Sequence, residues 1–584
     1  MGTLFDVGRI AAGGLLVAAL LASTCAVANA LSAPERSEAQ VTLKGVVSAE
    51  ELAKSQENLE ALRSLPVEMP RHRLPNGGLT SAPGRKTFDT LPLTPEPNVG
   101  VFGGIAPSFA SVKGFVGLFG GENPKVNAGL ELEPPDQGLA VNNNVAAEHI
   151  NLMIQFFNAT TGASMAGPIA DSKFFLVPAG FSLADTQVFF DPTTSRWFLD
   201  VIMFQNSTNT MDIALAISQT SNPLGKYFVY HVKAFSNTVS GCGGKDCFPD
   251  YIKAGYDANG FYISADLFMG APPSLGPFVE SAIFALPKSK LEADARFTYF
   301  RFDDPRDFVV QPSVPAPGEP FSTADNGSEF LMSAPGSPNV AVLAIINTNN
   351  IVSKGSTMKL LRTTVAGQSY GSGTVPSIQP DVIGPFCKSQ GVTSAPFLDG
   401  GFSAFQATIQ KAGGNLYGAL PFGAKDGTGL PRDVLAWFEL HPTLTSSSVS
   451  ASIVHQGLVV PGNGYSISNP AFGLNKTGAG VMGMSMSNKS NSVPGGFPSA
   501  AFIQFTGSAT TGSIIISGQG ATSDDGFTGC TPPGAPTGRW GDYAAATVDA
   551  KTGFFYTANE MIPDPTKFPR STESNWGTFI TQLH

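Results

Sequence analysis

A pattern of hydrophobic and polar residues typical of a β-hairpin recurs along the chain. Its clearest copies are DTQVFFDPTTSRWFLDVIM from Asp185, DYIKAGYDANGFYISADLF from Asp250 and DYAAATVDAKTGFFYTANEM from Asp542. Each copy has an acidic residue, a strand of six or seven residues, an Asp-led turn and an aromatic second strand. Short strands bounded by such turns predict an all-β structure.

Four further copies bring the count to seven. NPAFGLNKTGAGVMGMSMS from Asn469 keeps the spacing, DQGLAVNNN from Asp136 keeps the first half, and two weaker copies begin at Phe321 and Phe402. Each hairpin is followed by a second pair of alternating strands, and four strands make one propeller blade. The sequence therefore predicts a seven-bladed β-propeller of four-stranded blades over residues 99–584.

The last repeat ends in NWGTFITQLH, which supplies only a third strand. We expect a strand from the segment between Val99 and Gly121, which contains VGVFGGIA and KGFVGLFGG, to pair with the outer edge of this blade. Such a strand would close the ring and remove an exposed sheet edge.

The N-terminal part of the chain has a different pattern. An apolar run from Ile10 to Leu21, followed by Ala28, Asn29 and Ala30, predicts a signal peptide over residues 1–30 and a secreted or periplasmic protein. Residues 31–98 are interpreted as a mostly irregular extension with one short helix from Ala49 to Ser64. No later segment is apolar enough to predict a membrane span.

Composition fits this fold and limits the partners. Only 14% of residues are charged, and 65 Gly, 45 Pro and 43 Phe are typical of turn-dense β structure. A net charge of −10 without a basic run argues against nucleic acid. A glycan, a peptide or a cell-surface component is the expected partner of a protein that we expect to be monomeric.

The cysteines fit an oxidising compartment. Cys242 and Cys247, in CGGKDC, are predicted to form a local disulfide, with a metal site as the weaker alternative. The sequence leaves open whether Cys387 and Cys530 pair or stay free.

Several short motifs together carry a family resemblance. PPD at Pro134–Asp136, FPDY at Phe248–Tyr251, RWGDY at Arg539–Tyr543 and NWGT at Asn575–Thr578 resemble those of secreted bacterial seven-bladed β-propeller proteins of unassigned function. The resemblance spans the chain from Pro134 onward. It implies the fold and export, and it implies no catalytic residues.

The leading polar residue of each hairpin is the candidate site. The first strand of a propeller blade lines the central channel, so these residues are expected to meet at one channel end; they are Asp136, Asp185, Asp250, Asn469 and Asp542. Arg539 is the expected charge partner, and the four aspartates are candidate ligands of a Ca²⁺ ion. The alternative is that each residue caps its own turn. Asp191, Asp257 and Asp549 are predicted turn formers.

Two functions remain open at this stage. The chain has no HExxH motif, and its GQSYG at Gly367–Gly371 lacks the strand and helix that a nucleophile elbow needs, which favours a binding or scaffolding module. The alternative is a carbohydrate-active enzyme, a polysaccharide lyase or glycoside hydrolase, that uses channel-mouth carboxylates with Tyr251 or Tyr543 as acid or base. The four tryptophans are interpreted as packing residues.

Overall fold

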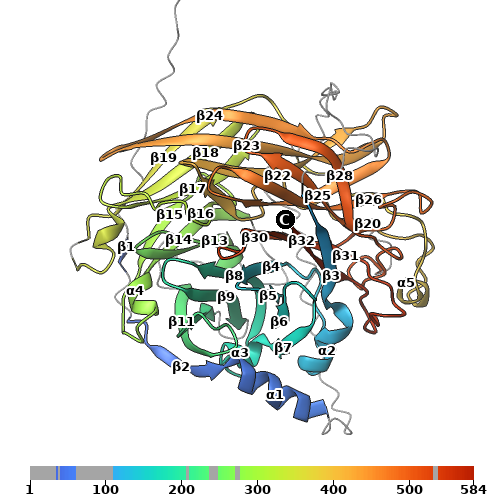
Figure 1. The fold of residues 1–584 in the computed structure, drawn as a ribbon, viewed down its shortest axis with the longest axis horizontal. Helices are drawn as coiled ribbons and strands as arrows, with labels where there is room; N and C mark the ends of the chain where they lie inside the picture. Colours follow the sequence, from blue (N-terminus) through green and yellow to red (C-terminus); the bar gives the residue numbers. More distant parts are fainter. Residues whose placement is uncertain are drawn as a thin grey trace, which may run out of the picture.

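Antiparallel strands dominate the molecule and surround a common centre (Figure 1). The computed structural model describes residues 35–36, 40–60, 109–205, 210–235, 247–269, 277–354, 356–371, 373–530 and 537–584. The predicted signal peptide and the VGVFGGIA stretch lie outside these residues. The all-β prediction is confirmed, and the repeated four-stranded antiparallel sheets are those of a β-propeller.

The strands form groups of four, which we call units 1 to 7 in chain order. Unit 1 has β4 (Gly138–Asn142), β5 (Val145–Ile150), β6 (Met153–Asn158) and β7 (Ser164–Ala170). Unit 2 has β8 (Ser182–Asp191), β9 (Arg196–Gln205), β10 (Thr210–Ser218) and β11 (Lys226–Phe235). Unit 3 has β12 (Cys247–Tyr256), β13 (Gly260–Met269), β14 (Phe278–Pro287) and β15 (Phe300–Asp304).

Units 4 and 5 are joined into one sheet by the parallel pairing of their first strands. Unit 4 has β16 (Gln311–Pro315), β17 (Ser328–Gly336), β18 (Asn339–Ile346) and β19 (Lys359–Ala366). Unit 5 has β21 (Ile409–Ala412), β22 (Asn415–Lys425), β23 (Pro431–Thr445) and β24 (Ser448–Val459). Unit 6 has β25 (Tyr465–Leu474), β26 (Ala479–Asn488), β27 (Ser499–Thr506) and β28 (Thr510–Gly518).

Unit 7 combines the two ends of the described chain. It has β30 (Ala545–Val548), β31 (Phe555–Met561) and β32 (Gly577–Leu583), and β3 (Val112–Phe119) pairs antiparallel with β32 at its outer edge. The predicted pairing of a segment between Val99 and Gly121 with the last repeat is therefore confirmed for its second half, KGFVGLFGG.

The described part of the N-terminal extension lies on the outer edges of three units. β1 (Glu35–Arg36) pairs with β15, β2 (Leu43–Ser48) pairs with β11, and α1 (Ala49–Glu60) contacts β7. The helix begins where the capping box predicted, with the Glu51 backbone N–H donating to Ser48 Oγ at 3.4 Å. This region was predicted to be an extension outside the main fold. The prediction missed these contacts because pairing with an outer strand requires no recognisable pattern in the local sequence.

The remaining elements are short connections. They comprise η1 (Gly120–Glu122), α2 (Asn123–Val126), α3 (Asp171–Phe174), α4 (Lys288–Leu291), η2 (Thr348–Asn350), α5 (Pro385–Ser389), β20 (Phe397–Leu398) and β29 (Thr537–Gly538). β20 and β29 pair in parallel between two long loops, 367–408 and 519–544. These loops bring residues far apart in sequence together on one face.

The hydrophobic core is divided among the spaces between successive units. Each of seven apolar clusters draws its members from two neighbouring units, including unit 7 with unit 1. Trp197, Trp540 and Trp576 are fully buried within or beside them, as expected for packing residues. Such packing explains why the repeats are rich in aromatic and β-branched residues.

The first strands of the units contact one another in sequence. β4 contacts β8, β8 contacts β12, β12 contacts β16, β16 contacts β21, β21 contacts β25, β25 contacts β30, and β30 contacts β4. These seven inner strands surround the centre of the molecule, where the candidate site residues lie.

Candidate functional site

In units 1, 2, 3 and 6, the chain has a local irregularity at or near the start of the inner strand, where the candidate residues lie. Asp136, Asp185, Tyr251 and Asn469 all have positive φ angles, between 50° and 56°. Asp185, Tyr251 and Asn469 sit where the register shifts, so each marks a β-bulge. Asp and Asn tolerate this left-handed conformation because their short side chains form local hydrogen bonds, which explains their recurrence.

The structure shifts two members of the predicted set by one residue. Tyr251, not Asp250, occupies the bulge position of unit 3, and Gly541, with φ of 35°, precedes Asp542 in unit 7. A Cβ atom on Gly541 would lie 2.6 Å from Asn469 Nδ2, so glycine is required there for space as well as conformation. The hairpin alignment missed this offset because it matched acidic residues rather than backbone geometry.

Asp136 and Asp185 join neighbouring units. Asp136 Oδ1 accepts from the Asp542 backbone N–H at 2.8 Å, and its Oδ2 accepts from Asn151 Nδ2 at 2.8 Å. The Asp185 backbone N–H donates to Asn151 Oδ1 at 2.9 Å, and Asp185 Oδ2 accepts from the Ile252 N–H at 3.3 Å. The alternative interpretation was that each carboxylate caps its own turn. The Asp136 and Asp185 carboxylates instead connect units 7, 1, 2 and 3.

Lys253 is a site residue that sequence reasoning missed. Its side chain is fully buried, and Nζ lies 3.3 Å from the centroid of the Tyr543 ring. Among the described residues Nζ has no hydrogen-bond partner, so its charge is offset by the ring face and by the surrounding carboxylates. Burial lowers the pKa of Lys253 to about 8, while Asp185, Asp136 and Asp542 oppose that shift.

The other predicted residues lie around this centre. Arg539 forms an ion pair with Asp542, as predicted, and its side chain is 27% exposed. Tyr543 accepts through its hydroxyl from the Thr186 N–H at 3.0 Å across the channel. Asp250 is half-buried and accepts from its neighbour's backbone, the Tyr251 N–H, at 3.1 Å. Asn469 lies beside Gly541, and its side-chain amide has no hydrogen-bond partner among the described residues.

Burial shifts the acids of this region toward their protonated forms. The pKa of Asp136 is raised well above its usual range by burial and then by Asp542 and Asp185. Burial raises the pKa of Asp200 to about 7, and neither of its carboxylate oxygens has a donor among the described residues. The channel end is thus a buried network in which Lys253 and Arg539 balance part of an acidic excess.

Among the described residues, the four predicted calcium ligands do not lie together in a tight cluster. In the described part of the chain, Cys387, Asp525 and Cys530 form the one set of three candidate ligands whose atoms all lie within 4.8 Å of one another. Asp136, Asp185, Asp250 and Asp542 do not form such a set. Lys253 supplies the positive charge that converging carboxylates require.

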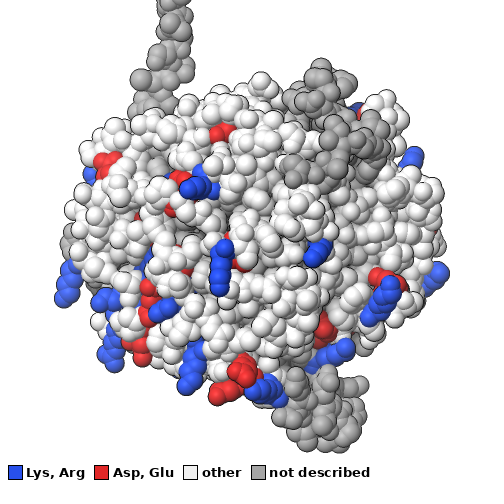
Figure 2. All heavy atoms as spheres, viewed as in Figure 1, with Lys and Arg blue, Asp and Glu red and all other residues white. Residues whose placement is uncertain are grey.

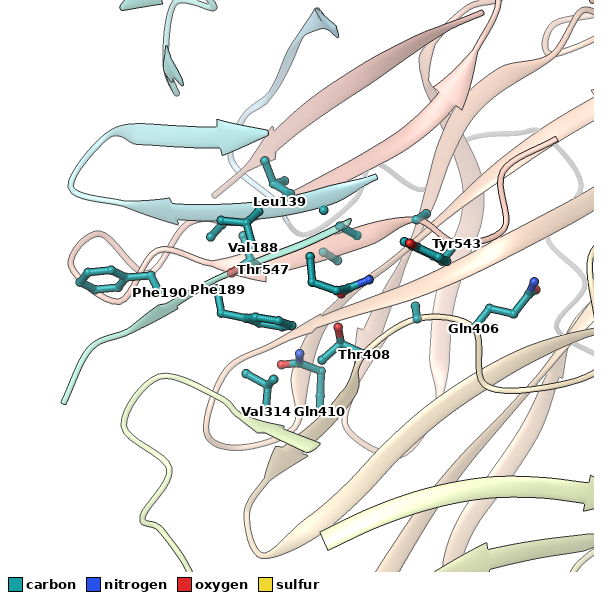
Figure 3. Close-up of a pocket in the computed structure, with 17 residues that line it drawn as sticks. Leu139, Val188, Phe189, Phe190, Val314, Gln406, Thr408, Gln410, Tyr543 and Thr547 are labelled. Atoms are coloured by element: carbon teal, nitrogen blue, oxygen red, sulfur yellow. The ribbon is translucent and has the colours of Figure 1, made fainter. Parts of the chain in front are cut away.

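The channel leading to this cluster is narrow. Its cavity has a volume of about 40 Å³, room for a few water molecules at most. Figure 3 shows Tyr543 and Gln406 at one end of the cavity, while Phe190 and Thr547 lie toward the other. Tyr543 is buried and Thr547 is half-exposed.

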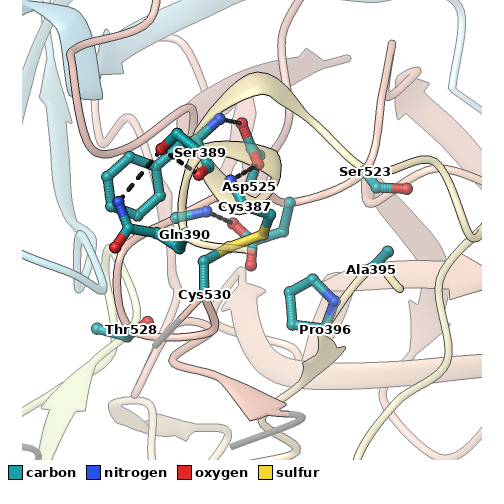
Figure 4. Close-up of a disulfide and its surroundings, with 12 residues drawn as sticks. Cys387, Ser389, Gln390, Ala395, Pro396, Ser523, Asp525, Thr528 and Cys530 are labelled. Carbon is teal, nitrogen blue, oxygen red and sulfur yellow. Dashed lines mark hydrogen bonds between the residues drawn. A yellow bond between two sulfur atoms is a disulfide. The ribbon is translucent and has the colours of Figure 1, made fainter. Parts of the chain in front are cut away.

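A second opening lies on the face that carries the long loops. This cleft has a volume of about 370 Å³ and lies between α5 and the loop that connects β31 to β32. Cys387 and Cys530 form a disulfide beside it, which answers the question that the sequence left open (Figure 4). Cys242 lies outside the described residues, so its pairing with Cys247 stays a prediction.

The face of the molecule drawn in Figure 2 shows no concentrated patch of charge. On the face drawn in Figure 2, Lys and Arg are scattered singly among Asp and Glu, and most of the surface is uncharged. No helix among the described residues is long and apolar enough to cross a membrane.

Comparisons with known proteins add distant structural likenesses. No protein-family model matches the chain, and the search of curated proteins finds no match. The similar solved structures include a Trypanosoma rangeli sialidase (9% identity, TM-score 0.29, covering 72% of this chain and 55% of that one). They also include a PL25 ulvan lyase (11%, 0.31, 76% and 94%) and an exo-β-1,3-galactanase from Clostridium thermocellum (10%, 0.27, 80% and 96%).

These likenesses are too distant to carry an argument about function. The chain spans little more than half of the sialidase, and each identity is 11% or lower. Function must therefore be argued from the site itself.

Proposed function

We propose that this protein is a secreted or periplasmic binding module that holds a glycan, a peptide or a cell-surface component on its loop-bearing face. One observation carries the proposal: Asp136, Asp185 and Tyr543, which are suited to acid–base chemistry, are buried, whereas a cleft of about 370 Å³ opens between α5 and the β31–β32 loop. Asp136, Asp185 and Tyr543 are 1%, 5% and 1% exposed, so a polysaccharide chain has no access to them. The cleft volume falls in the range of small-molecule and sugar sites.

The rigid scaffold behind this face is, in our proposal, a closed seven-bladed propeller of the kind that the PPD, FPDY, RWGDY and NWGT motifs resemble. The contact of β30 with β4, the apolar cluster shared by units 7 and 1 and the β3–β32 pairing support a closed ring. Binding loops on a closed ring keep their spacing because every blade packs on two neighbours.

Deletion of residues 99–121 tests the closure. It removes β3 and exposes the edge of β32, so we expect the melting temperature to fall sharply, by about 10 °C or more, with increased aggregation. A matched deletion of residues 61–83, which lie outside the described fold, is the control. An unchanged melting temperature after the first deletion would refute the closure by β3.

Export is supported by the described disulfide. Cys387 and Cys530 are 143 residues apart, and a disulfide between them persists in an oxidising compartment. Fusion of residues 1–30 to a reporter enzyme that is active only outside the cytoplasm tests this directly. A reporter retained in the cytoplasm would contradict the proposal.

A polysaccharide and peptide panel tests the function itself. The purified mature protein is screened for binding, and the same mixtures are assayed for new reducing ends and for unsaturated products. We expect saturable binding to at least one member and no turnover. Turnover of any panel member would contradict the proposed binding function and would show that the protein is an enzyme acting on that member.

A further inference from the structure

We propose that the cleft between α5 and the β31–β32 loop binds an uncharged oligosaccharide, with Phe386 as its stacking platform. This inference rests on the proposed binding function and assigns it a site and a ligand class.

The two walls of the cleft come from distant parts of the chain. Pro385, Phe386, Ser389 and Gln390 line one wall, and Arg570, Thr572 and Glu573 line the other. The walls belong to two connections on the loop-bearing face, so the cleft forms only when the units have assembled.

A single buried carboxylate fixes both walls. Asp525 is 1% exposed, and its oxygens accept from the Phe386 N–H at 2.9 Å and the Cys387 N–H at 2.8 Å on the first wall. On the second wall, Arg570 forms an ion pair with the same carboxylate and also donates to the Asp525 carbonyl at 3.2 Å. Asp525 thereby sets the distance between the walls before any ligand arrives.

The disulfide adds a covalent restraint to the same assembly. It links Cys387, next to Phe386, to Cys530 in the loop that carries Asp525 (Figure 4). Ordering of loops on binding costs free energy. Because the cleft is already held in place, a ligand avoids this cost and binds with higher affinity.

The chemistry of the lining favours hydroxyl groups over charges. The charge of Arg570 is neutralised by Asp525, so the residues that line the cleft offer no unpaired cation to a phosphate, sulfate or uronate, and Glu573 would repel such a group. Ser389 and Thr572 are exposed and Gln390 is half-buried, so hydroxyl and amide groups are presented to solvent beside the half-buried Phe386 ring. The negative face of an aromatic ring suits the C–H face of a pyranose, and the polar groups suit its hydroxyls.

A peptide fits this cleft less well than a sugar. Peptide recognition uses an exposed sheet edge, a deep apolar groove or a cluster of free arginines. The cleft offers one aromatic ring, short polar groups, Glu573 and an arginine that is already paired with Asp525 instead.

The experiment compares variants of the full mature protein on neutral polysaccharides such as β-glucan, galactan, mannan and arabinan, using affinity electrophoresis and calorimetry. Phe386→Ala and Thr572→Ala should weaken binding at least tenfold and about threefold, respectively. The matched controls, Phe397→Ala and Thr393→Ala, change exposed residues that do not line the cleft and should leave binding unchanged. Binding should also be unaffected between 0.1 and 0.5 M NaCl, since no charge pair is involved.

Each outcome separates the site from the general function. Tenfold loss in Phe386→Ala with unchanged controls supports the inference. Normal binding by both cleft variants would overturn the site but leave the binding module intact, and salt-sensitive binding only to charged polysaccharides would overturn the ligand class. No binding to any panel member would overturn the proposed function itself. Circular dichroism and thermal melting show whether each variant is folded. If Phe386→Ala does not fold, Thr572→Ala still tests the cleft, because Thr572 is exposed.

Discussion

The two ends of the inner hairpins use the same kind of residue in different ways. At the end away from the buried cluster, Asp191, Asp257 and Asp549 each accept from the backbone of their own turn, at 2.8, 2.7 and 2.9 Å. At the cluster end, Asp136 and Asp185 direct their side chains to other units. The turn end is held by hydrogen bonds within each hairpin, with additional contacts between units. The cluster end depends on hydrogen bonds between units, which form only in the assembled ring.

The additional contacts at the turn end make the contrast sharper. Asp191 also pairs with Lys288 at 2.7 Å, and Asp257 accepts from Thr348 Oγ1 at 2.6 Å. Both residues therefore shape their own hairpin and also contact a neighbouring unit. Asp136 keeps neither oxygen for its own turn, because Oδ1 accepts from the Asp542 N–H and Oδ2 accepts from Asn151.

The largest expected effect comes from removing the carboxylate of Asp136. Asp136→Ala leaves the Asn151 amide and the Asp542 N–H buried without their acceptor, so we expect a loss of about 4 to 5 kcal/mol. The matched variant is Asn475→Ala, which removes only turn bonds to Thr477 and Ala479 and should cost about 1 kcal/mol. Denaturant unfolding measures both, and equal losses would show that the two ends do not differ.

The next effect is the contribution of the cluster end to the pH dependence of stability. The folded-state pKa of Asp200 is about 7, above the unfolded value of about 3.9. The folded protein therefore binds this proton more tightly, and the associated stability is full below about pH 4 and is lost as pH rises through 7. Between pH 5 and pH 8 the loss from this group is about 2 to 3 kcal/mol.

Asp200→Asn removes this titration. Its free energy of unfolding at pH 8 should exceed that of the unmodified protein, and its stability should fall less between pH 5 and pH 8. Asp549→Asn, at the turn end, is the control and should keep the original slope. The same slope in Asp200→Asn and the unmodified protein would contradict the assignment.

The sequence was informative wherever the interaction was local. The Asp-led turns, the capping box at Ser48 and the strand from 113 to 121 were all predicted, because each depends on a few adjacent residues or on an unpaired edge. The meeting of Asp136 with Asp542 at one channel end also followed from the repeat, since equivalent positions in a ring face the same way.

What the sequence did not predict depends on contacts across the ring. Asn151 bridges two units from a two-residue connection, and Lys253 reaches Tyr543 from the opposite side of the channel. A signal for Lys253 was present: a lone charge inside the otherwise apolar strand YIKAGY is rarely buried without a partner. Nothing in the spacing of Cys387 and Asp525 indicated that they would meet Arg570 beside one cleft, because these residues are 45 to 183 positions from it.

A smaller loss of stability is expected when a single tyrosine hydroxyl is removed at either end. Tyr543→Phe leaves the Thr186 N–H buried without an acceptor and should cost about 1 to 2 kcal/mol. Tyr256→Phe, at the turn end, removes a donor from the Phe190 carbonyl, whose second lone pair remains available, and should cost less than 1 kcal/mol. Thermal melting of the pair checks the difference, and a larger loss in Tyr256→Phe would reverse the comparison.

The smallest expected effect is the change in melting temperature when calcium is added. Lys253 lies fully buried among Asp136, Asp185 and Asp542, so a divalent ion placed there would meet a fixed positive charge. We therefore expect the melting temperature of chelated protein to change by less than about 1 °C when millimolar Ca²⁺ is added, because an ion that does not bind cannot stabilise the fold. Lys253→Met removes that charge and leaves the carboxylates less balanced, so this variant should be less stable and should gain stability from Ca²⁺ if the aspartates can converge. A calcium-dependent rise in the unmodified protein would show instead that the carboxylates hold an ion alongside Lys253.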